Sequence, residues 1–216
     1  MTDTEVWLYG SSARGDRDPS SDVDLLVVGD GTVDWPGLPL PARDNLSISR
    51  YAWDEIEHMA DYGSLFLHHV REEGRPLQEM RGARLRGLLS EMGPYSRADR
   101  ELACFSAVIN DVERELEGDH SAQFELSVLA TAARHASILG CYLIGMPRFG
   151  RTSAFRTLLP QLGYADSFVN EVIHLYSFRR ADDEGRAVST RASTEDVNLW
   201  VVRIRQIIDE VALIAK

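Results

Sequence analysis

Lysine is almost missing from this 216-residue sequence: Lys216 is the only one, so arginine carries nearly all the positive charge. Acidic residues outnumber Lys and Arg by 34 to 23, and the formal net charge is −11. Proteins that bind nucleic acid generally need a basic face for the phosphates. We therefore expect no general affinity for nucleic acid, although one local basic site is compatible with this charge.

Two further absences narrow the class of protein. The sequence has no run of about 18 apolar residues, so we expect no membrane span, and no basic-then-apolar targeting segment begins it. Cysteine occurs twice, and Cys104 and Cys141 lie in apolar helical patterns without metal-ligand spacing. These features predict a cytoplasmic globular protein with two reduced thiols.

The first half of the sequence mixes short apolar runs with turn residues. Strands are predicted at 6–9, 23–28 and 46–51. The second is apolar almost throughout, as in a strand covered on both faces, and the third alternates as a strand with one buried face does. Segment 29–41, rich in Gly and Pro, should be a loop. One helix or two short ones should cover 53–73, and Gly74 is the expected stop.

From about residue 81 onward, the pattern predicts helices only. Apolar residues repeat at steps of three and four over 102–116, and 124–144 is apolar almost all round, which predicts the most buried helix. Ser193 and Asp196 form a capping box at the start of the last helix. The predicted fold class is α+β, with a small mixed-sheet domain at residues 1–80 and an antiparallel helical bundle at residues 81–216.

A pair of acidic residues, Asp22 and Asp24, lies at the start of the second predicted strand. Residues two apart on a strand project to the same face. Two carboxylates held close together repel each other unless cations neutralise them, and Mg²⁺ prefers carboxylates, phosphate oxygens and water as ligands. A pair of such ions can align an attacking oxygen and stabilise a leaving pyrophosphate.

The segment between the first two strands supplies groups that suit a phosphate. Gly10 lets the chain turn tightly after a strand, and the amides of a following helical turn would favour an anion. The Ser11 hydroxyl can donate to a phosphate oxygen, and Arg14 can pair with it. Ser21, next to the acidic pair, is a further candidate for contact with the nucleotide.

Together these residues resemble the nucleotidyltransferase superfamily that includes DNA polymerase beta, aminoglycoside nucleotidyltransferases and the minimal nucleotidyltransferases of prokaryotes. Those families carry a Gly-Ser, a following Arg-Gly and a metal-binding Asp-x-Asp on the next strand. The resemblance implies that Gly10 and Ser11 hold the triphosphate of ATP or another NTP, that Arg14 assists, and that Asp22 and Asp24 ligate Mg²⁺. Segment 63–74 also looks like the helix that ends this domain in bacterial members. The helical half is similar to the bundle on the acceptor side of aminoglycoside nucleotidyltransferases.

The sequence departs from that pattern at the third carboxylate, which completes the metal site or acts as base in active members. The strand that should carry it, 46–51, presents Ser47 and Ser49 on its polar face. Asp44 is the nearest acid, in phase with Leu46 unless a loop or bulge rotates it. Asp44 is therefore the candidate third catalytic acid; without it, the site has two carboxylates and turnover is slow or absent.

Two other groups carry weaker signals. His68 and His69 point about 100° apart on a helix, so they are expected to be surface or half-buried residues rather than joint metal ligands. Arg114 and His120 have a spacing that resembles the Arg-His motif of HEPN-type ribonucleases, which leaves RNA cleavage by the helical half as an alternative function.

The expected function is Mg²⁺-dependent transfer of a nucleoside monophosphate, with AMP from ATP as the leading case, to an acceptor hydroxyl. The acceptor is a small molecule or a protein side chain, and a homodimer is compatible with an open site. The alternative is a catalytically weak or inactive module of antitoxin type, which binds a nucleotide or a partner and lacks the third carboxylate.

Overall fold

The computed structural model describes residues 3–17, 21–42, 45–79, 82–116, 121–183 and 192–216. The chain divides into two compact units, Met1–Ser96 and Arg97–Lys216, and each is described here by itself. This division lies later than the boundary predicted at residue 80, because helix α4 (Arg84–Glu91) packs against α2 (Trp53–Asp61) and α3 (Leu65–Glu73) of the first unit.

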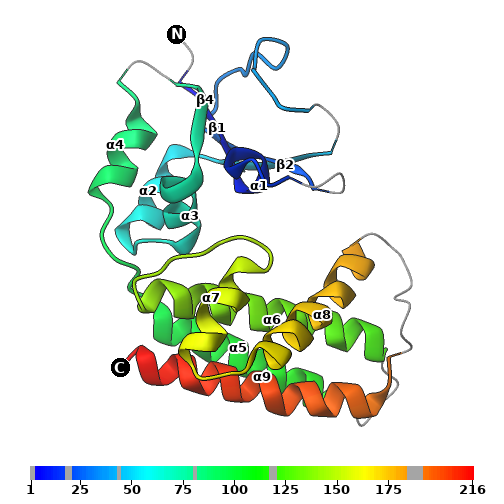
Figure 1. Ribbon diagram of the computed structural model, residues 1–216. Coiled ribbons are helices and arrows are strands. Elements are labelled where there is room, and N and C mark those ends of the chain that lie inside the picture. Colours follow the sequence, from blue (N-terminus) through cyan, green and yellow to red (C-terminus); the bar gives the residue numbers. More distant parts are fainter. Residues whose placement is uncertain (1–2, 18–20, 43–44, 80–81, 117–120, 184–191) are drawn as a thin grey trace. The chain divides into compact units, whose positions relative to one another are not determined.

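The first unit is built on a four-stranded sheet with the order β3-β2-β1-β4 (Figure 1). Strand β1 (Glu5–Tyr9) pairs antiparallel with β2 (Val23–Val28) and with β4 (Arg75–Gln78), whereas β3 (Leu46–Tyr51) pairs parallel with β2. The sheet is therefore mixed. Together with the helical second unit, it confirms the predicted α+β fold, and the predicted bounds of β2 and β3 are confirmed as well.

The two faces of the sheet are covered differently. Trp7, Leu26 and Val28 belong to a core shared with α2, α3 and α4. On the opposite face, Val27 packs with loop residues such as Leu38, so the predicted 29–41 loop closes this side of the sheet. Because both faces are covered, β2 is buried along nearly its whole length, as its apolar sequence predicts.

Strand β3 differs from the expectation of one buried apolar face. Ile48 is 44% exposed, whereas Ser49 faces the helix side and shares a hydrogen bond of 3.2 Å with the Tyr9 hydroxyl. The reason is topological: β3 is an edge strand, and the buried loop core lies over the two central strands. The alternation of apolar and polar residues predicted the strand correctly, but its more buried face is the one that carries Ser47 and Ser49.

Two features near α3 differ from the sequence expectations. The sequence did not predict β4, a short edge strand that contains Pro76. Gly74 does end α3, but with an extended backbone at φ −68 rather than the left-handed cap that was expected. A side chain at Gly74 would meet the carbonyl oxygen of Val70, so close packing accounts for the glycine.

The second unit consists of helices in its described part: α5 (Ala98–Glu115), α6 (Ala122–Leu143), α7 (Ser153–Gln161), α8 (Asp166–Asp183) and α9 (Thr194–Ile214). Helix α6 packs against the other four and is the most buried, as predicted (Figure 1). By length and composition, α6 is also apolar enough to cross a membrane, but 61% of its most apolar window is buried within the protein. Cys104 and Cys141 are both free thiols, as predicted. The capping box of Ser193 and Asp196 at the start of α9 is confirmed.

Candidate functional site

The segment after β1 folds into a tight turn and one short helix, α1 (Gly10–Arg14). Gly10 has a left-handed backbone (φ +68), a conformation that disfavours every residue with a β-carbon. The Ser11 carbonyl accepts hydrogen bonds from the amides of Gly15 and Asp16, at 3.0 and 3.2 Å. The turn predicted between the first two strands is thus a single short helix whose end is fixed by these backbone hydrogen bonds.

Asp24 lies directly against this turn. A β-carbon added at Gly10 would come within 2.5 Å of Asp24 Oδ2, so the glycine leaves just enough room for the carboxylate. On the sheet, Asp24 pairs with Tyr9 on β1 and with Ser47 on β3. The structure therefore brings a carboxylate of the Asp-x-Asp pair and the backbone of the Gly-Ser turn together.

Asp22 is exposed and lies just before β2. Its carbonyl is 3.5 Å from the Ser12 hydroxyl, a long hydrogen bond between the residue and α1. Ser21 beside it is buried, and its carbonyl accepts a hydrogen bond from Arg17 Nε at 3.1 Å. The main chain before β2 is thus tied to the turn and the residues after it.

Tyr9 extends the site beneath Asp24. Burial is the main reason that the pKa of Tyr9 is raised, and the nearby Asp24 charge raises it further, although the hydrogen bond with Ser49 acts in the opposite direction. The ring also contacts Phe66 and His69 edge to face, with centroids 5.5 and 5.4 Å apart. Tyr9 is therefore a neutral, fixed support for the strand end that leads into the turn.

The third carboxylate is the part of the pattern that the structure does not supply among its described residues. Ser47 is the β3 residue in register with Asp24. Asp44, the candidate third acid, lies outside the described residues. Within those residues, no group of three or more His, Cys, Asp or Glu side chains is arranged to hold a metal ion.

Arg14, at the end of α1, is bound by two acids. Its Nε lies 3.1 Å from Asp16, and its Nη1 lies 2.5 Å from Oε2 of Glu73 at the end of α3. Burial alone would lower the pKa of Arg14, but the hydrogen bonds and charges of Asp16 and Glu73 outweigh it and raise the pKa. The predicted phosphate-binding arginine is thus part of an ion pair.

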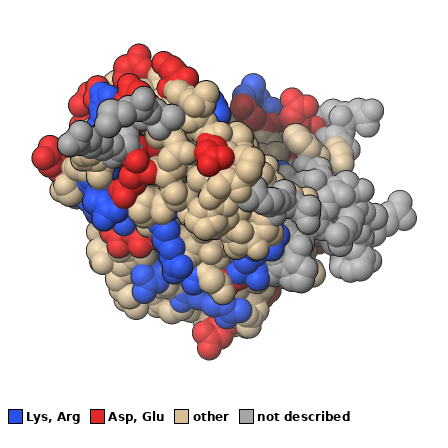
Figure 2. Space-filling view, turned by 90° about the horizontal axis from the view of Figure 1, so that it is seen from above, with Lys and Arg blue, Asp and Glu red and all other residues tan. Residues whose placement is uncertain are grey.

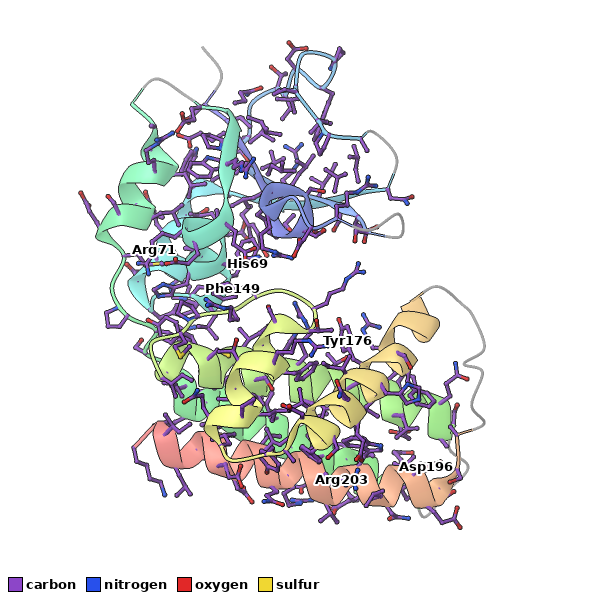
Figure 3. All side chains as sticks on the ribbon, in the orientation of Figure 1. His69, Arg71, Phe149, Tyr176, Asp196 and Arg203 are labelled. Atoms are coloured by element: carbon purple, nitrogen blue, oxygen red, sulfur yellow. The ribbon has the colours of Figure 1, made fainter. Side chains whose placement is uncertain are left out.

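Glu73 is also bound by His69, at 2.8 Å from Nε2. Glu73 was not a site candidate from the sequence, and His69 was expected only to be a surface or half-buried residue. The i,i+4 spacing of His69 and Glu73 in one helix was the available signal, but the contact with Arg14 joins residues 59 apart in the chain. His68 is buried, contrary to the expectation of a surface or half-buried residue, while His69 is half-buried as expected. Figure 3 labels His69 on α3.

Of the two residues in the alternative ribonuclease motif, Arg114 belongs to the described part of the chain. Arg114, at the end of α5, is exposed and pairs with Asp111 one turn earlier. His120 lies outside the described residues.

The oxygen ligands of this turn fit a magnesium–triphosphate group in chemical type. Mg²⁺ binds carboxylate oxygens and phosphate oxygens together. The first backbone amides of a helix have no hydrogen-bond acceptor within the helix, so they can donate to an anion. The close approach of the Asp24 carboxylate to the Gly10 turn is the observation that supports this fit. Figure 2 shows acidic side chains beside arginines on the face that it presents, so a basic site would be local.

Comparison with known proteins gives three results. Residues 1–62 match the family described as nucleotidyltransferase domain. Among solved structures, the chain resembles a nucleotidyltransferase-like protein from Exiguobacterium sibiricum 255-15, with 14% identity and a TM-score of 0.34, over 99% of this chain and 70% of that one. No curated protein matches the sequence.

Proposed function

Because residues 1–62 match the family described as nucleotidyltransferase domain, we propose that the protein transfers a nucleoside monophosphate from an NTP to an acceptor hydroxyl. ATP is the leading donor, and the acceptor is a small molecule or a protein side chain. The observation that carries this proposal is the contact of the Asp24 carboxylate with the Gly10 turn, two residues after Asp22. A carboxylate pair beside a turn of this kind is suited to a metal-bound triphosphate.

In this proposal, Asp22 and Asp24 would hold Mg²⁺, which neutralises the charge of the triphosphate and of the leaving pyrophosphate. Gly10 keeps the turn close to Asp24, and the Ser11 hydroxyl and Arg14 donate to phosphate oxygens. Asp44 is the proposed base toward the acceptor hydroxyl.

A binding and turnover experiment tests the proposal. Binding of ATP is measured by calorimetry with and without Mg²⁺, and pyrophosphate release is followed with candidate hydroxyl acceptors. The double variant Asp22→Ala/Asp24→Ala should lose Mg²⁺-dependent binding. The matched control is Asp30→Ala, which removes an exposed acid just beyond the other end of β2. Equal nucleotide binding by the wild type and the double variant would refute the proposal.

The second candidate is a binding module without turnover, and the register that places Ser47 beside Asp24 favours it. Here ATP binds, no acceptor yields pyrophosphate, and Asp44→Asn changes neither result. If turnover occurs in the wild type and is lost in Asp44→Asn, the enzyme is favoured. RNA cleavage that survives loss of Asp22 and Asp24 but is abolished by His120→Ala would instead favour the ribonuclease alternative.

A further inference from the structure

A cluster of three polar side chains, Arg14, Glu73 and His69, joins α1 to α3. One oxygen, Oε2 of Glu73, accepts from both Nη1 of Arg14 and Nε2 of His69, at 2.5 and 2.8 Å. The side chain of Glu73 is only 13% exposed. A carboxylate in this position is stable only because both neighbours bind it.

The cluster keeps Glu73 charged. Burial alone would raise the pKa of Glu73, but the hydrogen bonds and charges of His69 and Arg14 outweigh it, so the pKa is lowered. His69 is itself fixed, because its ring packs edge to face on Tyr9, the residue just before the turn. Glu73 is therefore an anion held in one place beneath α1.

This anion binds only part of the Arg14 guanidinium. An arginine has five N–H donors in one plane, at Nε, Nη1 and Nη2. Nε donates to Asp16 and Nη1 to Glu73, whereas Nη2 donates to none of the residues that the structure describes. Asp16 and Glu73 thus hold the guanidinium at two of its three nitrogens, in the helical turn that begins at Gly10.

We propose that Glu73, oriented by His69, is a positioning residue that holds Arg14 so that its Nη2 group binds a triphosphate oxygen of the nucleotide. An arginine that is already held loses less side-chain freedom when it binds an anion. The proposal rests on the proposed function, since the nucleotide must bind at the Gly-Ser turn. It adds a role for two α3 residues that lie far in sequence from the turn.

The test is a double-mutant cycle on nucleotide affinity. The Kd of ATP with Mg²⁺ is measured for the wild type, Glu73→Ala, Arg14→Ala and the double variant, with AMP as the ligand that lacks the triphosphate. Each single variant should weaken ATP binding about tenfold, the effect of one charge-assisted hydrogen bond. The double variant should bind ATP as Arg14→Ala does, and AMP binding should be equal in all four proteins.

Two further variants separate positioning from a general structural role. Glu72→Ala removes the adjacent, more exposed acid, which pairs with Arg71, and should leave the Kd of ATP unchanged. Glu73→Gln keeps an oxygen that can accept both hydrogen bonds, and should recover most of the affinity lost in Glu73→Ala. If Glu73→Ala does not fold, the Kd of ATP is measured for Glu73→Gln alone and for Glu73→Gln combined with Arg14→Ala. The small loss of ATP affinity caused by Glu73→Gln should then be absent when Arg14 is alanine.

The outcomes are distinguishable. If Glu73→Ala or Glu73→Gln weakens ATP binding by the same factor with and without Arg14, Glu73 acts through the fold and the positioning role is wrong. If the wild type binds ATP and the Glu73 variants bind it equally well, the positioning role alone is overturned. If the wild type binds no nucleotide, the proposed function fails and this inference fails with it.

Discussion

The fit between Gly10 and Asp24 can be tested by adding one methyl group. In Gly10→Ala, the new β-carbon meets two penalties: the left-handed backbone at φ +68, and the Asp24 Oδ2 atom at 2.5 Å. A left-handed backbone costs alanine about 1 kcal/mol. Displacing the Asp24 carboxyl from its rotamer costs roughly another 1 kcal/mol. The first unit should therefore lose about 2 kcal/mol of unfolding free energy.

Gly15→Ala is the matched control, because Gly15 also has a left-handed backbone (φ +84) but no atom lies within 4 Å of an added β-carbon. This variant should lose only the backbone part, about 1 kcal/mol. Unfolding in urea is followed by fluorescence of Trp7 and Trp53, which lie in the core of the first unit. A Trp200→Phe background removes the signal of the second unit, so each measurement reports one transition.

The cycle with Asp24 isolates the contact itself. In an Asp24→Ala background, the carboxylate is gone, and Gly10→Ala should cost no more than Gly15→Ala does, about 1 kcal/mol. If Gly10→Ala and Gly15→Ala are equally destabilising when Asp24 is present, the β-carbon added at Gly10 does not clash with the Asp24 carboxylate. An unchanged cost of Gly10→Ala without Asp24 would lead to the same conclusion.

Three further predictions concern stability. Gly140→Ala places a β-carbon 2.6 Å from Leu158 and should destabilise the second unit by about 1–2 kcal/mol in urea unfolding, although alanine has the better helix propensity. At Gly87, an added β-carbon meets no atom within 4 Å, so Gly87→Ala should stabilise the first unit by up to about 1 kcal/mol. Ser193→Ala removes the cap of α9 and should lower the unfolding free energy of the second unit by about 1 kcal/mol. Burial, aided by the Arg71 charge, lowers the pKa of His68 to about 4, below the unfolded value of 6.5. The unfolded state therefore binds the extra proton between these values, and the unfolding free energy of the first unit should fall by about 2 kcal/mol from pH 7 to pH 5, a loss that His68→Phe reduces.

The sequence predicted best those elements whose signal is local. Strand β2 has a continuous apolar run with turn residues before it, and its bounds follow directly from that pattern. The same holds for the capping box of α9, where Ser193 and Asp196 are three residues apart. Strand β4 has no such signal, because Arg75 and Pro76 favour no strand and pair only with β1.

The candidate site divides in the same way. The acids of the Asp-x-Asp pair and the Gly-Ser turn lie within one short segment, so their spacing could be read from the sequence. The ion pair between Arg14 and Glu73 depends on how α3 packs on α1, which no local pattern contains. The half-buried position of Ser49 likewise depends on the place of β3 at the sheet edge and on the Tyr9 hydroxyl beside it.

The position of a third acid depends on the backbone at Asn45. Strand parity alone would place Asp44 on the side of Leu46, away from Asp24, because side chains alternate along a strand. That rule holds only within a regular strand, and β3 begins at Leu46. Asn45 has a left-handed backbone at φ +56, while its carbonyl accepts a hydrogen bond from the Val23 amide at 2.9 Å. The chain therefore enters the sheet beside β2 through a non-strand residue, and the alternation of β3 cannot be extended to Asp44. Strand parity therefore does not count against Asp44 as the base, and turnover in Asp44→Asn decides between the enzyme and the binding module.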